Sequence, residues 1–153
     1  MIEILANETI KDGRTITIKH SSHIAFTPAF TFYLRQVADL IDNGHGSKFT
    51  SWDDETTGIL WAEIEGKIVA IFAYHTDQIK YKILNVSLTA VDKDHRGLGI
   101  HTIMNKYFEQ TAIRLGCNLT AATVHPNNSV RLKSAEKDGL KIGYYKLYKK
   151  LEK

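Results

Sequence analysis

The amino-acid sequence predicts an α/β domain built around a mixed β-sheet. Two long segments carry hydrophobic residues at three- and four-residue spacing, which is typical of amphipathic helices. Shorter segments of alternating or continuous apolar residues indicate strands. The resulting order of strand, helix, three strands, helix, strand, helix and strand is typical of a sheet covered by helices. Because the chain has only two prolines and no repeat or low-complexity stretch, we expect residues 1–153 to form a single domain.

The overall composition excludes several classes of protein. The 153 residues carry a net charge of only +3, with 20 basic and 17 acidic residues interspersed, so nucleic acid is not an expected partner. A single cysteine, Cys117, excludes an internal disulfide and is typical of a reducing compartment. The charged N-terminus lacks the apolar core of a signal peptide, and no apolar run approaches the roughly 20 residues of a membrane span. We therefore expect a cytoplasmic protein that does not contact a membrane.

The first part of the chain predicts a strand and a helix. Alternation over Arg14–His20 indicates the strand. The helix follows Thr27, which we expect to be its N-cap with Pro28 in the first turn, and it ends at residues 42–44. Its apolar stripe consists of Phe30, Tyr33, Leu34, Val37, Leu40 and Ile41.

Three strands are predicted in the middle of the chain. Residues 59–64 and 68–75 flank a Glu-Gly-Lys turn and form a hairpin, and the second strand is apolar on both faces, as expected of a central strand. The third strand spans residues 81–91 and alternates regularly. We expect one of its faces to carry Leu84, Val86, Leu88 and Ala90, and the other to carry Asn85, Ser87 and Thr89.

The last part of the chain predicts a second long helix and three shorter elements. The helix begins at Ile100 and stops at Gly116. A strand over residues 119–124, a helix over 128–138 and a strand over 142–147 follow it. The stripe of the long helix continues through Ile103, Met104, Tyr107, Phe108, Thr111 and Leu115.

Residues 94–101, Asp-His-Arg-Gly-Leu-Gly-Ile-His, lie where the third strand of this group leads into the long helix. Glycines let a backbone turn tightly and bring its N–H groups close to a ligand. The unpaired N–H groups and the dipole at the start of a helix bind anions such as a pyrophosphate, and Arg96 can add charge-assisted hydrogen bonds. The spacing fits neither a P-loop nor the three-glycine dinucleotide fingerprint. The segment therefore predicts a phosphate-binding turn of another kind.

Two motifs together resemble those of a known family. A strand ending at Val91, four spacer residues, the run Arg96–Ile100 and an amphipathic helix resemble the acetyl-CoA-binding motif of the GNAT acetyltransferases. Downstream, Asn128 and the Glu-Lys-Asp-Gly-Leu run at residues 136–140 resemble the family's next helix, and the order of elements is similar from Arg14 onward. The resemblance implies a mostly antiparallel sheet of six to seven strands with helices on both faces.

The resemblance also implies an N-acetyltransferase that moves an acetyl group from acetyl-CoA directly to a primary amine. In this family the strand before the motif exposes backbone groups to the pantetheine arm, and the turn holds the pyrophosphate. A backbone N–H near residues 88–90 would steady the oxyanion that develops on the thioester. The residues that the resemblance assigns to the cofactor are Leu88, Ala90, Val91, Arg96, Gly97, Leu98, Gly99, Ile100, His101 and Asn128.

Two positions depart from the family pattern. His101 stands where the motif ends in glycine or alanine, and it can either donate to a phosphate or point outward from the helix; reading the motif over Asp94–Gly99 would remove this departure. The tyrosine that commonly protonates the leaving thiolate falls at Ala135. Tyr144, Tyr145 or water would then serve, or catalysis would be weak or absent.

The general base is not fixed by the resemblance. Some family members place a glutamate near the position of Asn85, and asparagine cannot take a proton at neutral pH. Glu63 and His75 on neighbouring strands are the candidates, although both residue types are also common as ordinary surface or half-buried residues.

The acceptor and the partners are expected only by class. The acidic run at residues 53–55 would attract a cationic amine of a small molecule or a peptide, and family members often form homodimers through C-terminal strands. No spacing of the seven histidines fits zinc, so no metal is expected. Two alternatives remain open: a non-catalytic acyl-CoA-binding module, and a small basic nucleic-acid-binding protein suggested by the lysine-rich residues 146–153.

Overall fold

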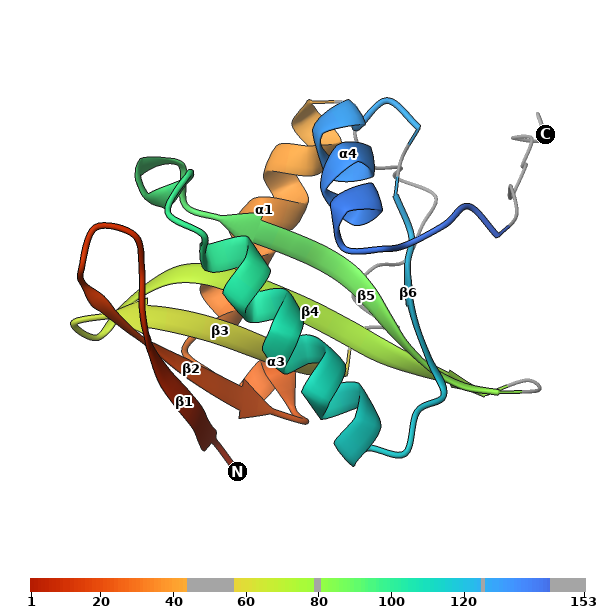
Figure 1. Cartoon of the computed structure of the whole chain (residues 1–153), viewed down its shortest axis with the longest axis horizontal. Helices are drawn as coiled ribbons and strands as arrows, with labels where there is room; N and C mark the ends of the chain where they lie inside the picture. The colour runs from red at the N-terminus through yellow and green to blue at the C-terminus, as the bar shows by residue number, and fades with distance from the viewer. Residues whose placement is uncertain (44–56, 79–80, 125, 144–153) are drawn as a thin grey trace, which may run out of the picture.

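The computed structural model describes residues 1–43, 57–78, 81–124 and 126–143 (Figure 1). Within these residues, six strands form one sheet in the order β1-β2-β3-β4-β5-β6; β5 and β6 are parallel and all other neighbours are antiparallel. The strands are β1 (Glu3–Thr9), β2 (Thr15–Ser21), β3 (Gly58–Ile64), β4 (Lys67–Gln78), β5 (Lys82–Val91) and β6 (Leu119–Ala122). The helices are α1 (Phe30–Asp42), α3 (Ile100–Arg114) and α4 (Ser129–Lys137), with the short 3₁₀ turns η1 (Ile24–Phe26) and η2 (Lys93–His95).

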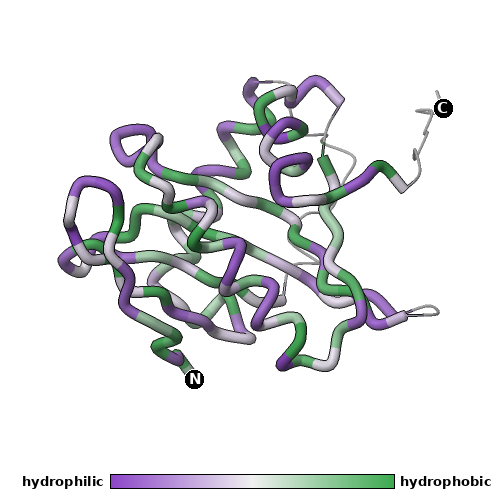
Figure 2. Tube along the Cα trace, viewed as in Figure 1, coloured by the Kyte–Doolittle hydropathy of each residue, from purple (hydrophilic) through white to green (hydrophobic). Residues whose placement is uncertain are grey.

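Helices cover both faces of the sheet, and the predicted fold class is confirmed (Figure 1). One face packs against α1 through a cluster that includes Tyr33 and Trp61. The other face packs against α3 through a larger cluster that includes Phe72 and Met104. Both faces need a cover because β4, inside the sheet, is apolar on each side. In Figure 2, hydrophobic residues are frequent along the central strands, whereas the hairpin ends are mostly hydrophilic.

The sequence pattern did not predict β1. Its residues, Glu-Ile-Leu-Ala-Asn-Glu-Thr, lie at the edge of the sheet, where most side chains are exposed and no apolar alternation is needed. The strand pairs antiparallel with β2, from Glu3 opposite His20 to Thr9 opposite Thr15.

A β-bulge interrupts the pairing of β4 with β5. Ala73 pairs with Leu88, and the next residue, Tyr74, pairs with Val86, so Ser87 is an extra residue with no partner in the ladder. Such an insertion bends the strand locally and shifts every later side chain by one position.

Because of the bulge, the prediction of which β5 side chains share a face of the sheet is wrong. Leu84 and Val86 pack under α3, whereas Leu88 and Ala90 pack under α1. All four had been expected on one face because the sequence alternates without a break. One inserted residue reverses the alternation, and the residue types themselves carry no mark of it.

The predicted N-cap of the first helix is also wrong. The cap residue of α1 is Ala29, and it makes no side-chain capping bond. The Thr27 hydroxyl instead donates to the carbonyl of Ile24 at 2.8 Å, within the preceding 3₁₀ turn.

Several predictions concern the end of the chain. Residues 142 and 143 are not in a strand, so the predicted strand over 142–147 is wrong there. The rest of that strand, Tyr144, Tyr145, the lysine-rich tail and the acidic run 53–55 lie outside the described residues. Among the described residues, no helix is long and apolar enough to cross a membrane.

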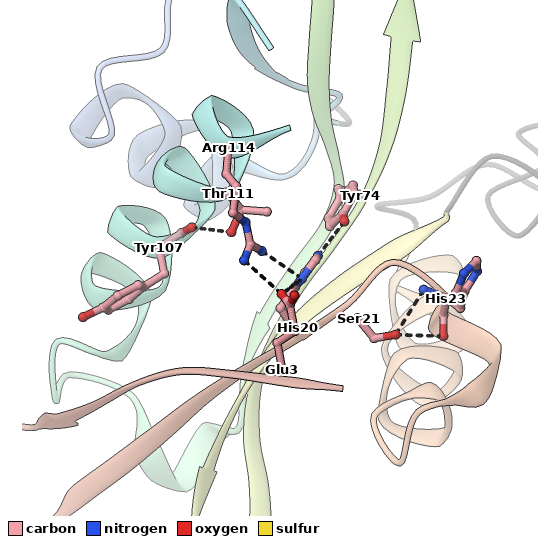
Figure 3. Close-up of polar contacts among 8 residues, drawn as sticks. All are labelled: Glu3, His20, Ser21, His23, Tyr74, Tyr107, Thr111 and Arg114. Carbon is pink, nitrogen blue, oxygen red and sulfur yellow. Dashed lines mark hydrogen bonds and ion pairs between the residues drawn. The ribbon is translucent and has the colours of Figure 1, made fainter. Parts of the chain in front are cut away.

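A buried histidine joins the edge of the sheet to α3 (Figure 3). His20 is 3% exposed; its Nε2 lies 2.7 Å from the Tyr74 hydroxyl and its Nδ1 lies 3.1 Å from the Glu3 carboxylate. Arg114, at the end of α3, pairs with the same carboxylate at 3.0 Å. The same Nδ1 lies 3.2 Å from a guanidinium nitrogen of Arg114, which can only donate, so Nδ1 contacts an acceptor and a donor.

Burial disfavours the charged forms of this histidine and tyrosine. Loss of hydration lowers the pKa of His20 below its usual value, and the Arg114 charge acts in the same direction, while Glu3 opposes it. Burial also raises the pKa of Tyr74 to about 12. Both shifts have the same cause, since a low-dielectric interior penalises the charged form.

We expect stability to decrease as the pH falls below about 6.5, because the unfolded chain protonates His20 more readily than the folded chain does. Thermal unfolding midpoints between roughly pH 5 and pH 8 measure this dependence. His20→Gln removes the buried titrating group and flattens the profile in this window. His23→Gln, which changes an exposed histidine nearby, keeps the wild-type slope. Equal slopes for wild type and His20→Gln would contradict the assignment.

Candidate active site

The end of β5 has a free edge that leads into a turn. Pairing of β5 with β6 stops at Val86 opposite Ala122, although β5 continues to Val91. Among the described residues, β6 therefore leaves the edge of β5 open from Ser87 onward. From Ser87 to Val91 an extended chain covers roughly 13 Å. This edge can take backbone hydrogen bonds from an extended ligand.

The turn between β5 and α3 holds backbone N–H groups that are not used elsewhere. In the described part of the chain, the N–H groups of Gly97, Leu98 and Gly99 donate to no other group. Gly97 and Gly99 have φ angles of +77° and +82°, a left-handed conformation that side chains with a Cβ rarely adopt. Successive N–H groups in such a turn, followed by the N-terminus of α3, form a concave anion-binding surface.

Side chains hold this turn in place. The Arg96 Nε donates to the carbonyl of Val91 at 3.2 Å, and His95 Nδ1 lies 2.8 Å from the Asp92 carboxylate. The hydrogen bond from His95 lowers the pKa of Asp92. The Asp92 N–H donates to the carbonyl of Val69 on β4 at 2.7 Å, so the turn is tied to the sheet. Contacts within the chain therefore fix the form of the turn.

Sequence reasoning missed Lys11, which lies against the same turn. The Lys11 N–H donates to the carbonyl of Leu98 at 3.3 Å. A Cβ on Gly99 would lie 3.6 Å from the Lys11 side chain, which places its aliphatic part beside the turn. Lys11 belongs to the β1–β2 hairpin, and since β1 was not predicted, no local signal could bring it here.

His101 contacts α4 and the core. Its Nε2 lies 2.9 Å from the Asp138 carboxylate at the end of α4, and its ring packs on Phe72 with centroids 5.0 Å apart. Asp138 also lies 3.6 Å from the guanidinium of Arg131. The histidine thus contributes to the contact between α3 and α4.

Arg131 and Asn128 fix the start of α4. The Arg131 side chain is 13% exposed, and burial lowers its pKa, opposed by the charge of Asp138. Asn128 is the N-cap, and its side-chain oxygen accepts the N–H of Arg131 at 3.1 Å. Since the cap uses the oxygen, only the amide NH₂ of Asn128 remains to face a ligand.

The two candidate bases are far apart. Glu63 accepts a hydrogen bond from Trp61 Nε1 at 2.8 Å and pairs with Lys19 at 2.9 Å, so both of its oxygens are engaged. It lies opposite Ile68, seven residues along β4 from His75, which corresponds to roughly 20 Å. His75 lies beside the bulge instead. The structure brings His75, and not Glu63, to the free edge of β5.

Ala135 and Asn85 stand where the family has its common acid and base. Ala135 is 8% exposed and faces the interior from α4, and Asn85 lies opposite His75 in the sheet. No group of three or more histidine, cysteine, aspartate or glutamate side chains among the described residues has the arrangement of a metal site.

Comparison with known proteins agrees with this geometry. The profile of the Acetyltransferase (GNAT) family matches residues 24–140, which is most of the chain. The chain belongs to the GNAT acetyltransferase family. The resemblance found in the sequence is therefore confirmed. No curated protein matches the sequence significantly.

Solved structures share the fold of this GNAT chain. One is the aminoglycoside acetyltransferase meta-AAC0020 from an uncultured soil metagenomic sample, with 14% identity, a TM-score of 0.68, and coverage of 90% of this chain and 97% of that chain. Another is the ribosomal-protein-alanine N-acetyltransferase from Brucella melitensis biovar Abortus 2308, with 14% identity, a TM-score of 0.69, and coverage of 89% and 99%. A third is the aminoglycoside N-acetyltransferase AAC(6')-Iy in complex with CoA, with 12% identity, a TM-score of 0.64, and coverage of 96% and 99%.

In this GNAT chain we expect Asp138→Asn to lower the free energy of unfolding by about 3 kcal/mol, because the buried Arg131 loses its ionic partner. Urea unfolding followed by circular dichroism measures the change. Asp94→Asn, which alters an exposed carboxylate in the turn region, is the matched control and changes stability by less than about 0.5 kcal/mol. Equal effects of the two substitutions would contradict a structural role for Asp138.

Proposed function

We propose that this protein transfers an acetyl group from acetyl-CoA directly to a primary amine, and that residues 1–153 act as one domain. The observation that carries the proposal is the continuity of two features. The free edge of β5 runs into a turn in which the N–H groups of Gly97, Leu98 and Gly99 donate to no other described residue. Together they match a ligand that has an extended arm and a phosphate-bearing end.

The turn and its surroundings suit the phosphates of CoA. The N–H groups of residues 97–100 would face the pyrophosphate, since they lie at the start of α3 and donate to no other described residue. Arg96 is exposed and uses one nitrogen to hold the turn, which leaves the others for a phosphate. Lys11 supplies a second cation from the neighbouring hairpin. The pantetheine arm would follow Leu88–Val91 toward the bulge. The side-chain amide of Asn128 would contact this arm.

The reaction is a direct displacement at the thioester carbon. The amine nitrogen forms the new C–N bond, the C–S bond breaks, and sulfur departs with the electron pair. A backbone N–H of β5 near residues 88–90 stabilises the charge that develops on the carbonyl oxygen. Because the buried Ala135 cannot donate a proton, water protonates the thiolate in this proposal.

An amine acceptor is supported by the solved structures with this fold. They include an aminoglycoside acetyltransferase and a ribosomal-protein-alanine N-acetyltransferase, and both kinds of acceptor offer amino groups. Such different acceptors share one fold, so the fold supports the class of acceptor and not its identity. Release of CoA thiol in the presence of an amine separates an enzyme from a module that only binds acyl-CoA.

We expect Gly99→Asp to weaken CoA binding about 100-fold, because a carboxylate beside the pyrophosphate adds repulsion of a few kcal/mol. Isothermal titration calorimetry with CoA measures the loss. Both aspartate and asparagine tolerate the left-handed backbone of Gly99, and the new Cβ would make only ordinary contact with Lys11 at 3.6 Å.

Gly99→Asn is therefore a control that matches the shape of aspartate without its charge. It should keep most of the affinity, and both variants should show the same small loss of melting temperature, because both place a Cβ at a left-handed position. If Gly99→Asp binds CoA as tightly as Gly99→Asn does, the phosphate does not lie at this turn.

A further inference from the structure

Three side chains form a hydrogen-bonded chain at the bulge. His75 Nδ1 lies 3.0 Å from the hydroxyl oxygen of Ser87, and His75 Nε2 lies 3.1 Å from the Asp77 carboxylate. The imidazole is only 12% exposed, so its orientation is set by the protein. A hydroxyl, an imidazole and a carboxylate in this order are the arrangement in which an imidazole takes a proton through a hydroxyl.

The Asp77 carboxylate fixes which nitrogen of the neutral His75 ring carries the hydrogen. The Asp77 carboxylate only accepts hydrogen bonds, so Nε2 carries the hydrogen and Nδ1 is the bare nitrogen. The Ser87 hydroxyl therefore donates to Nδ1. In this tautomer the Ser87 oxygen can receive one proton while the Ser87 hydroxyl passes its own proton to His75 Nδ1.

Asn85 adds an unused acceptor to the same group. Its Nδ2 donates to the Asp77 carboxylate at 3.3 Å, which fixes the direction of the amide. Its Oδ1 is buried and has no hydrogen-bond partner among the described residues. A buried carbonyl oxygen without a donor is costly, and the N–H of a bound amine would satisfy it.

The position of Ser87 links the group to the proposed chemistry. Ser87 is the extra residue of the bulge, and the free edge of β5 begins there. Bulges near active sites redirect a side chain that a regular strand would place elsewhere. His75 and Asn85 alternate with residues that pack under α3, so they lie on the α1 face of the sheet. The amine would therefore approach from the α1 face, across the sheet from α3.

We infer that Ser87, His75 and Asp77 form a relay that removes the proton from the attacking amine, with Asn85 Oδ1 holding another N–H of that amine. This inference rests on the proposed function. The bound ammonium nitrogen first gives one proton to the Ser87 oxygen, while the Ser87 hydroxyl proton passes to His75 Nδ1. The neutral nitrogen then bonds to the thioester carbon, the C–S bond breaks, and sulfur keeps the electron pair. Water takes the second proton from the nitrogen and protonates the thiolate. Asp77 is a positioning residue that holds the tautomer of His75.

CoA thiol release, with acetyl-CoA and the best acceptor from a panel of alkylamines, polyamines, aminoglycosides and peptides, tests the relay. At about pH 7, His75→Gln and Ser87→Ala should each lower kcat about 100-fold or more. The double variant should be no slower than the slower single variant, because the residues act as a unit. Ser87→Thr, which keeps the hydroxyl, should restore most of the rate. Thr76→Val, between His75 and Asp77 on the exposed side of β4, is the matched control and should keep the wild-type rate.

The pH dependence separates proton removal from a structural role. As the assay pH approaches the pKa of the acceptor, near 10 for an alkylamine, the amine loses its proton without help, so the loss caused by His75→Gln should shrink to less than about tenfold. Asp77→Asn should lower kcat at about pH 7, and this loss should also shrink as the assay pH rises. KM for acetyl-CoA should stay unchanged. A loss that is the same at every pH would overturn the relay. So would an acetyl group found on Ser87 by mass spectrometry, because Ser87 would then be the nucleophile.

The two proposals fail in different ways. If the wild type binds CoA but releases no thiol with any amine, the transferase proposal is wrong, and the relay is wrong with it. If the wild type releases thiol and His75→Gln is as fast at about pH 7, only the relay is wrong.

Discussion

The extra residue Ser87 in β5 determines how the rest of the site is arranged. It reverses the alternation of β5, so that Leu88 faces α1 although Val86 faces α3. It coincides with the last pair between β5 and β6, and so it marks the start of the free edge. It also turns a hydroxyl toward His75. The open backbone edge and the polar group beside it therefore begin at the same residue.

Contacts within the chain hold the turn after β5 in its form. The Arg96 side chain donates to the carbonyl of Val91, and the Asp92 N–H ties the turn to β4. The Lys11 N–H donates to the carbonyl of Leu98. What remains are N–H groups and the start of α3, which favour a negative charge. At the other end of α3, the buried pair His20 and Tyr74 links the sheet to Arg114 and has a structural role. Some buried polar groups, such as His20 and Tyr74, therefore stabilise the fold. Others, such as the N–H groups of the turn, would bind a ligand.

Much of the fold followed from the sequence because it depends on local patterns. The stripes of α1 and α3 and the apolar run of β4 are visible in hydropathy, and the Arg-Gly-Leu-Gly run identified the turn through its residue types. The bulge at Ser87 was not predictable, since regular alternation in the sequence gives no sign of an extra residue. Lys11 and Asp77 were missed for a different reason. Their roles arise from neighbours on other strands, which only the register of the sheet brings together.

The central claim is that a single ligand occupies both the turn and the free edge of β5. A two-dimensional ¹H–¹⁵N NMR titration with CoA tests it directly, because each backbone N–H reports its own contact. The account predicts the largest shifts at residues 97–100 and along residues 88–91, with little change over the outer strand Glu3–Thr9. Shifts that are absent from both segments, or that occur at the turn without the edge of β5, would contradict it.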